Sequence, residues 1–192
     1  CFGGDLAGIT DKLDYLQNLG INGLYLTPIN EAPSNHKYDT TDYTKIDPRF
    51  GDEETFKHLV KEAHKRGIRV MLDGVFNHCG WYFFAFDDVV KKGEQSAYRD
   101  WFYGLTYPVV RPEDPEEYPG YECFGYERMM PKLNLANPET AEYFCKVGRY
   151  WVEKFHIDGW RLDVASEIND GFWRKFRESV KSVDPNAILI GE

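Results

Sequence analysis

Two hydrophobic periods alternate along this chain, because stretches with helical spacing of apolar residues are each followed by a short apolar run. The helical stretches predict helices over about 10–20, 52–67, 138–155 and from about 170, and the apolar runs predict strands at 21–26, 68–75, 157–162 and 187–190. The positions expected to face inward are Leu13, Leu16, Leu19, Phe56, Leu59, Val60, Ala63, Phe144, Val147, Trp151, Phe155, Phe172, Phe176 and Val180. Regular alternation of helix and strand predicts an α/β protein with a parallel sheet covered by helices.

Residues at the expected helix ends support this division. We expect the first helix to begin at the cap Thr10-Asp11 and to end at Gly20, which suits a left-handed C-terminal cap. Pro138, directly after Asn137, is a good first residue for the third helix.

Three of the apolar runs lead to an acidic residue at the same end of the strand: Asp73, Asp163 and Glu192. In a parallel barrel the carboxyl ends of the strands meet at one rim, where that architecture builds its active sites. We therefore expect the three carboxylates to converge, and they predict a carboxylate-driven hydrolase.

One stretch, residues 79–133, breaks the alternation. It is rich in Trp, Tyr, Phe, Pro and Glu, lacks a clean period, and is too long for an ordinary connection between a strand and its helix. We therefore predict a barrel segment over 1–78, an inserted subdomain over 79–133 and a second barrel segment over 134–192.

Composition narrows the class of partner. The net charge is −9, with Lys and Arg scattered among acids, so nucleic acid is not expected, because phosphate binding needs a basic stripe. Aromatic residues make up 16% of the chain. Either stacking on sugar rings or a large aromatic core explains that share. No signal peptide or apolar run of transmembrane length is present, so no membrane partner is expected.

The four cysteines, Cys1, Cys79, Cys123 and Cys145, show neither CxxC spacing nor a His/Cys cluster. We expect free, mostly buried thiols, no zinc site and a cytoplasmic location, since a chain of this size does not need disulfide staples. Both ends of the sequence fall in mid-pattern, and we expect the true N-terminus to lie elsewhere.

Asp163 and Glu192 suit glycosidic bond cleavage, in which one acid protonates the leaving oxygen and a second carboxylate attacks or activates water. The intervening sequence fits one helix and the next strand, which places the two acids on neighbouring strands. Strands lie ~4.8 Å apart, close to the roughly 5–5.5 Å carboxylate separation of retaining enzymes. Arg161 faces the same side as Asp163 and can hold it ionised, although an ordinary buried ion pair is the alternative.

Three segments resemble the conserved blocks of the α-amylase superfamily, glycoside hydrolase family thirteen. Residues 73–78 (DGVFNH) are similar to its first block, 159–167 to its second, and 188–192 (ILIGE) to the start of its third. Residues 130–134 (MPKLN) and 165–167 (ASE) resemble the group of cyclomaltodextrinases, neopullulanases and maltogenic amylases. The resemblance covers essentially the whole chain. It implies the second to fifth strands of a (β/α)8 TIM barrel, a partial barrel with the inserted subdomain after the third barrel strand.

The resemblance also implies roles for individual residues. Asp163 would be the nucleophile, and Glu192 the general acid that later activates water. Arg161 would orient Asp163, His78 would hydrogen-bond the sugar under attack, and Tyr38 would stack beneath that ring.

Asp73 would be a structural and electrostatic support, and we place Glu167 among the substrate-binding residues as well. Each role has a structural alternative. Tyr38 and its neighbour Tyr43 could simply pack on the barrel, and a lone histidine such as His78 is usually a satisfied structural residue.

Two family features are missing from these residues: a third catalytic aspartate, in an Asn-His-Asp block, and the strand before residues 2–5 (FGGD). We therefore expect the chain by itself to be inactive and poorly stable, with an open barrel edge. Many relatives hold calcium through an asparagine matching Asn77 and a histidine where this chain has Glu167. We expect no metal and do not favour calcium, although a carboxylate is itself a good calcium ligand.

These observations predict a retaining α-glucan hydrolase that cleaves α-1,4 bonds in cyclodextrins, maltodextrins or pullulan, without a cofactor. Transglycosylation is an expected side activity. The alternatives are another superfamily member, such as an oligo-α-glucosidase or a transglycosylase, and a non-catalytic barrel relative. A homo-oligomer formed through parts outside these residues stays open.

Overall fold

The computed structural model describes residues 3–111, 113–114 and 117–192. Four parallel strands form its central sheet, in the order β1-β4-β7-β8. Their bounds are β1 Gly23–Leu26, β4 Arg69–Gly74, β7 Gly159–Leu162 and β8 Ile188–Gly191. The predicted parallel sheet is confirmed, and each strand end lies within two residues of its predicted position.

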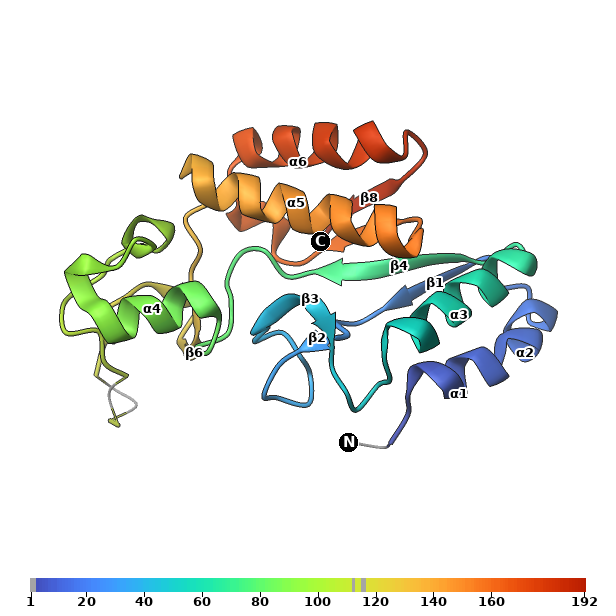
Figure 1. Ribbon diagram of the computed structural model, residues 1–192, viewed down its shortest axis with the longest axis horizontal. Helices are drawn as coiled ribbons and strands as arrows, with labels where there is room; N and C mark the ends of the chain where they lie inside the picture. The colour runs from blue at the N-terminus through green and yellow to red at the C-terminus, as the bar shows by residue number, and fades with distance from the viewer. Residues whose placement is uncertain (1–2, 112, 115–116) are drawn as a thin grey trace.

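Helices cover one face of this sheet, and two short antiparallel pairs complete the described structure (Figure 1). The helices are α1 Leu6–Asp11, α2 Leu13–Asn18, α3 Glu53–Lys65, α4 Phe84–Lys92, α5 Pro138–Phe155 and α6 Asp170–Val183, with single turns of 3₁₀-helix at η1 Gly93–Gln95, η2 Arg99–Trp101 and η3 Ala165–Glu167. The antiparallel pairs are β2 Asn30–Glu31 with β3 Asp42–Ile46, and β5 Cys123–Phe124 with β6 Glu127–Pro131.

The three long helices begin where their side-chain caps are. Asp52 caps α3 by accepting from the Thr55 N–H, and Asn137 caps α5 with Pro138 in the first turn. The inward positions expected for these helices are buried. A glycine, Gly148, lets α5 approach α6 closely, since a Cβ there would lie 2.5 Å from the ring of Phe176.

The predicted first helix is wrong in its start and in one inward residue. The structure has two short helices, α1 and α2, and Asp5 caps the first by accepting from the Gly8 N–H. Thr10 does not cap, because its hydroxyl donates to the Leu6 carbonyl within α1. Leu19 is 62% exposed, since the second helix ends before it at Asn18.

The segment between β4 and α5 lies beyond the carboxyl ends of the parallel strands, where α4 and the β5–β6 hairpin sit together (Figure 1). The sequence predicted no regular period here, yet α4 is a helix that buries Ala85, Phe86 and Val89. Its N-cap, Phe83, makes no side-chain capping bond, so the usual start signal is missing. The boundaries proposed at 78/79 and 133/134 stay a prediction.

Many aromatic residues belong to the core. Tyr43 in β3 is 2% exposed and packs edge-on against Phe83 and Phe144, so its structural alternative is the one observed. Cys79 and Cys145 are buried free thiols and Cys123 is a half-buried one, as expected, while Cys1 lies outside the described residues. Within the described ranges, no helix is both long and apolar enough to cross a bilayer.

Candidate active site

The three predicted acids meet at the carboxyl ends of adjoining strands, around the guanidinium of Arg161. In the sheet register Arg161 pairs with Asp73 of β4, so their side chains share one face. The Arg161 Nη1 atom lies 3.0 Å from Asp73 Oδ1 and 2.6 Å from Asp163 Oδ1, and Nη2 lies 2.5 Å from Glu192 Oε1. One cation therefore bridges an acid from each of three strand ends.

Asp163 is held in an environment that sets its charge. Burial raises the pKa of its carboxyl to about 6, opposed by the hydrogen bond from Arg161 and reinforced by the nearby charges of Asp73 and Glu192. Asp163 is consequently still mostly ionised at neutral pH, as the role predicted for it requires.

Glu192 is fixed through the residue that follows Asp163. Val164 has φ 48°, a left-handed conformation that a β-branched residue adopts only under strain. Its N–H donates to Glu192 Oε2 at 2.9 Å. The Glu192 side chain is 53% exposed, so its carboxyl group is accessible to an incoming molecule.

Arg161 and the three acids that it contacts form the first group of site residues, and two tyrosines join this group at Asp73. Tyr38 and Tyr25 both donate to Asp73 Oδ2, Tyr38 at 3.1 Å. Burial raises the pKa of Asp73, opposed by hydrogen bonds from Tyr25 and Arg161. Tyr25 was not among the predicted site residues, although alternation in the strand over 21–26 places it on the face opposite Leu24 and Leu26.

His78 and Glu167 lie in a second group, beside the β5–β6 hairpin. The imidazole of His78 is 1% exposed and stacks on the ring of Phe124, with centroids 4.7 Å apart. Burial lowers the pKa of His78 to about 4, so the ring is neutral and one nitrogen carries hydrogen. Its Nε2 makes no hydrogen bond of good geometry within the described residues. Glu167 is bound by Lys132, with Nζ 3.0 Å from Oε2.

The family's calcium position holds one unpaired oxygen and one paired carboxylate in this structure, and the absence of a metal there stays a prediction. The Asn77 Oδ1 atom is buried without a hydrogen-bond partner in the described ranges, which would suit a ligand. Glu167, however, already binds the ammonium of Lys132, and the residues described contain no cluster of three or more His, Cys, Asp or Glu suited to a metal. We therefore derive no step through calcium.

The first group has the components of two-carboxylate chemistry. Asp163 and Glu192 follow neighbouring strands whose register pairs Leu162 with Gly191, and both face Arg161. A nucleophile close to an acid suits a retaining displacement. The structure thus brings together Tyr38, Asp73, Arg161, Asp163 and Glu192. His78, whose ring interacts with the Tyr38 backbone, and Glu167 form the second group next to them.

Known proteins share this arrangement of strands. A cyclomaltodextrinase structure superposes with a TM-score of 0.93 at 51% identity, over 98% of this chain and 32% of that one. The cyclic α-maltosyl-(1→6)-maltose hydrolase from Arthrobacter globiformis superposes with a TM-score of 0.93 at 46% identity, over 99% and 42%. These neighbours are (β/α)8 enzymes, which confirms the predicted partial barrel.

Sequence comparison gives the same relatives. The chain is 56% identical over 191 residues to the cyclomaltodextrinase of Geobacillus thermopakistaniensis (strain MAS1) and 54% identical over 192 residues to neopullulanase 2 of Thermoactinomyces vulgaris. Each match covers 100% of this chain and 32% of the relative, so the chain spans roughly a third of their length. The pattern of the family described as "Alpha amylase, catalytic domain" matches residues 2–192. The chain therefore belongs to the alpha-amylase family and forms part of its (β/α)8 catalytic domain.

Proposed function

We propose that this chain carries the nucleophile and the general acid of a retaining α-glucan hydrolase. The enzyme would cleave α-1,4-glycosidic bonds in cyclodextrins, maltodextrins or pullulan. One observation carries the proposal: a single guanidinium, that of Arg161, binds both Asp163 and Glu192 at neighbouring strand ends. The names of the relatives, cyclomaltodextrinase and neopullulanase, support the substrate class.

In the first step of the proposed mechanism, an Asp163 oxygen attacks the anomeric carbon and the glycosidic C–O bond breaks. Glu192 gives its proton to the leaving oxygen, and a covalent glycosyl-enzyme forms. In the second step water attacks the same carbon, Glu192 takes the water's proton, and Asp163 leaves as a carboxylate. A sugar hydroxyl in place of water gives transglycosylation.

The other site residues serve binding in this proposal. Arg161 orients Asp163 and holds it ionised, and Asp73 holds Arg161 from the other side. Tyr38 offers its ring to the sugar while its hydroxyl is held by Asp73. His78 is neutral because it is buried, and its N–H would reach a sugar hydroxyl only after the Phe124 ring that covers it moves. Glu167 lies beside it.

We also propose a cytoplasmic location, supported by the free thiols and by a 53% identical relative named intracellular maltogenic amylase from Bacillus subtilis (strain 168). Neutral α-glucan oligosaccharides, rather than nucleic acid, are the proposed partners of a chain with net charge −9. Assembly into a homo-oligomer stays a prediction.

The test compares the full-length protein with its Asp163→Asn variant on β-cyclodextrin, pullulan and soluble starch. We expect the variant to lose on the order of 10⁶-fold in kcat, as when a nucleophile is removed. Asp170→Asn, at an exposed position in the first turn of α6, is the matched control and should keep full activity. Product released from the unmodified enzyme should first appear as the α-anomer, which NMR detects.

Equal activity in wild type and Asp163→Asn would remove the nucleophile assignment. A β-anomeric first product would exclude the retaining mechanism even if Asp163 proved essential.

A further inference from the structure

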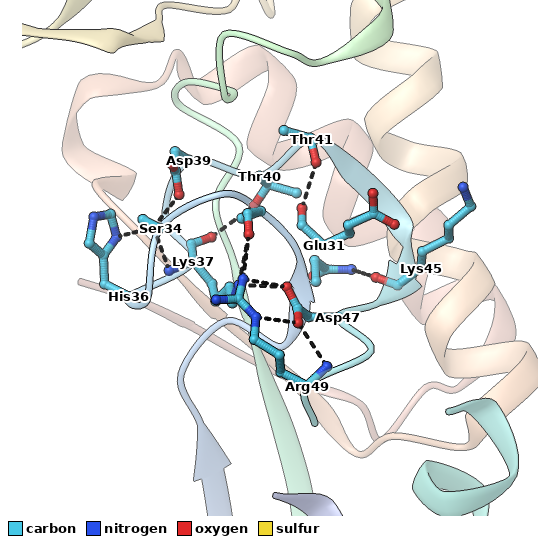
Figure 2. A network of polar contacts seen from close by, with 12 residues as sticks. Glu31, Ser34, His36, Lys37, Asp39, Thr40, Thr41, Lys45, Asp47 and Arg49 are labelled. Carbon is cyan, nitrogen blue, oxygen red and sulfur yellow. Dashed lines mark hydrogen bonds and ion pairs between the residues drawn. The ribbon is translucent and has the colours of Figure 1, made fainter. Parts of the chain in front are cut away.

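A lysine is buried in the loop that presents Tyr38. Lys37 is 1% exposed, and its Nζ lies 2.5 Å from Asp47 Oδ2 and 2.7 Å from the Ala32 carbonyl (Figure 2). Lysine is almost never fully buried unless paired, and burying an ion pair costs desolvation. A loop that joins two short strands, such as β2 and β3, can reverse the chain direction without a buried ion pair between Lys37 and Asp47.

Asp47 ties this loop together through a second cation. Arg49 binds it with two side-chain nitrogens, Nε at 2.9 Å and Nη2 at 3.1 Å, and also donates to the Ala32 carbonyl at 3.0 Å (Figure 2). Burial raises the pKa of Asp47, but the hydrogen bonds from Arg49 and Lys37 more than offset it and hold the pKa well below its usual range. Asp47 is thus a permanently charged anchor.

The backbone conformation of Lys37 determines how the next residue, Tyr38, is oriented. Lys37 has φ 69°, a left-handed conformation that is uncommon outside glycine. The chain turns there, so the Lys37 side chain enters the interior while the Tyr38 hydroxyl reaches Asp73 at 3.1 Å.

The residue after Tyr38 is fixed as well. Asp39 accepts a hydrogen bond from Ser34 (Figure 2), and the Thr40 carbonyl accepts from the Gly80 N–H at 2.7 Å. Gly80 packs so closely that a Cβ on it would lie 2.2 Å from the Asp39 carbonyl. Tyr38 therefore lies between two residues that are each held by contacts of their own.

We propose that Lys37 and Asp47 form a positioning pair, which holds Tyr38 against Asp73 and so sets the sugar-binding surface beside Asp163. The inference rests on the proposed function, because it takes Tyr38 as a substrate contact. The pair does not touch the sugar itself. A pair that only stabilised the loop would lower the melting temperature without changing the kinetics of the folded enzyme.

The test is a double-mutant cycle of Lys37→Met and Tyr38→Ala in the full-length protein, with kcat and KM measured on β-cyclodextrin. Displacing a binding group by about 1 Å can cost up to ~100-fold, so Lys37→Met should lower kcat/KM by roughly 10- to 100-fold. In the Tyr38→Ala background the same change should alter kcat/KM within about twofold, because the group it positions is gone. Val180→Ala, in the buried face of α6, is the control that should lower Tm and leave kcat/KM unchanged.

An equal loss in both backgrounds overturns the positioning pair while the activity itself stands. If Lys37→Met does not fold, Arg49→Met replaces it, since the Arg49 side chain is 52% exposed. Its smaller loss in kcat/KM should likewise disappear in the Tyr38→Ala background.

A wild-type protein that hydrolyses no α-glucan defeats the proposed function instead. In that case the crystal structure of Lys37→Met still decides the pair. A Tyr38 hydroxyl displaced from Asp73 supports it, and a hydroxyl that remains within hydrogen-bond distance overturns it.

Discussion

Replacing Arg161 with methionine should shift the dependence of kcat/KM on pH, because it removes the positive charge beside Asp163. Its guanidinium contacts Asp163, whose side chain is 10% exposed, and Asp73, whose side chain is fully buried. The pKa of Asp163 is about 6 with Arg161 present. An adjacent opposite charge lowers a carboxyl pKa by ~1–3 units, so its removal should bring that of Asp163 to roughly 7–9.

The direction of the effect on rate follows from the ionised form being the nucleophile. In the wild type, kcat/KM should fall as pH drops through about 6, because protonated Asp163 cannot attack. At pH 7 a carboxyl of pKa near 8 is only about 10% ionised, compared with about 90% for a pKa near 6, so Arg161→Met should lose roughly tenfold from protonation alone.

The assay is kcat/KM on β-cyclodextrin between pH 4 and 10, with the full-length protein. The profile is bell-shaped, because Asp163 must be ionised and Glu192 protonated. Protonation of Asp163 moves the acid limb to higher pH, whereas a misplaced Asp163 lowers the whole profile without moving that limb, so the shift of the acid limb measures the charge effect. Lys154→Met, which removes the exposed ion pair with Glu53, is the control and should leave the profile unchanged. An Arg161→Met profile with the wild-type acid limb would refute the reasoning.

Two further predictions concern the sheet and the metal. Gly159→Ala should lower the stability of the full-length protein by about 3 kcal/mol or more, because a Cβ would lie 2.1 Å from the Ile188 carbonyl and separate β7 from β8. Thermal unfolding checks this against Gly23→Ala, where a Cβ would meet nothing within 4 Å, and equal Tm values would contradict it. Calcium should change Tm equally in the wild type and in Glu167→Gln, since Lys132 already binds Glu167, and a calcium-dependent rise that the variant loses would show a site there.

The sequence predicted the helices and strands of the sheet because their signals are local. Apolar spacing and caps such as Asp52 and Asn137 act within one or two turns, and the structure confirms both. The prediction that Thr10 caps a helix was wrong for a reason that is also local. Its hydroxyl could bond either to the start of a following helix or to a carbonyl in the preceding turn, and it bonds to the Leu6 carbonyl within α1. Helix α4 lacked a side-chain cap, so no start signal marked it in the sequence.

Strand ends and strand alternation alone made part of the site predictable, namely the three acids and Arg161, whereas Tyr38 was predicted only from the resemblance to the family. Asp73, Asp163 and Glu192 could be placed together because parallel strands align their carboxyl ends. Tyr25 could not, because its contact with Asp73 depends on side-chain reach across β1 and β4. Lys37 could not either, since a lysine in a polar loop gives no sign that it is buried.

The register that joins Asp73 to Arg161 limits how the chain can change in length. Side chains alternate between the two faces of a strand, so inserting one residue between Gly159 and Arg161 would turn the guanidinium toward the helices. The same insertion at 184–186, between α6 and β8, leaves every strand in phase. Natural variants of this protein should therefore gain and lose residues only in the connections, and a library of single-residue insertions would map the strands as the positions where none survives.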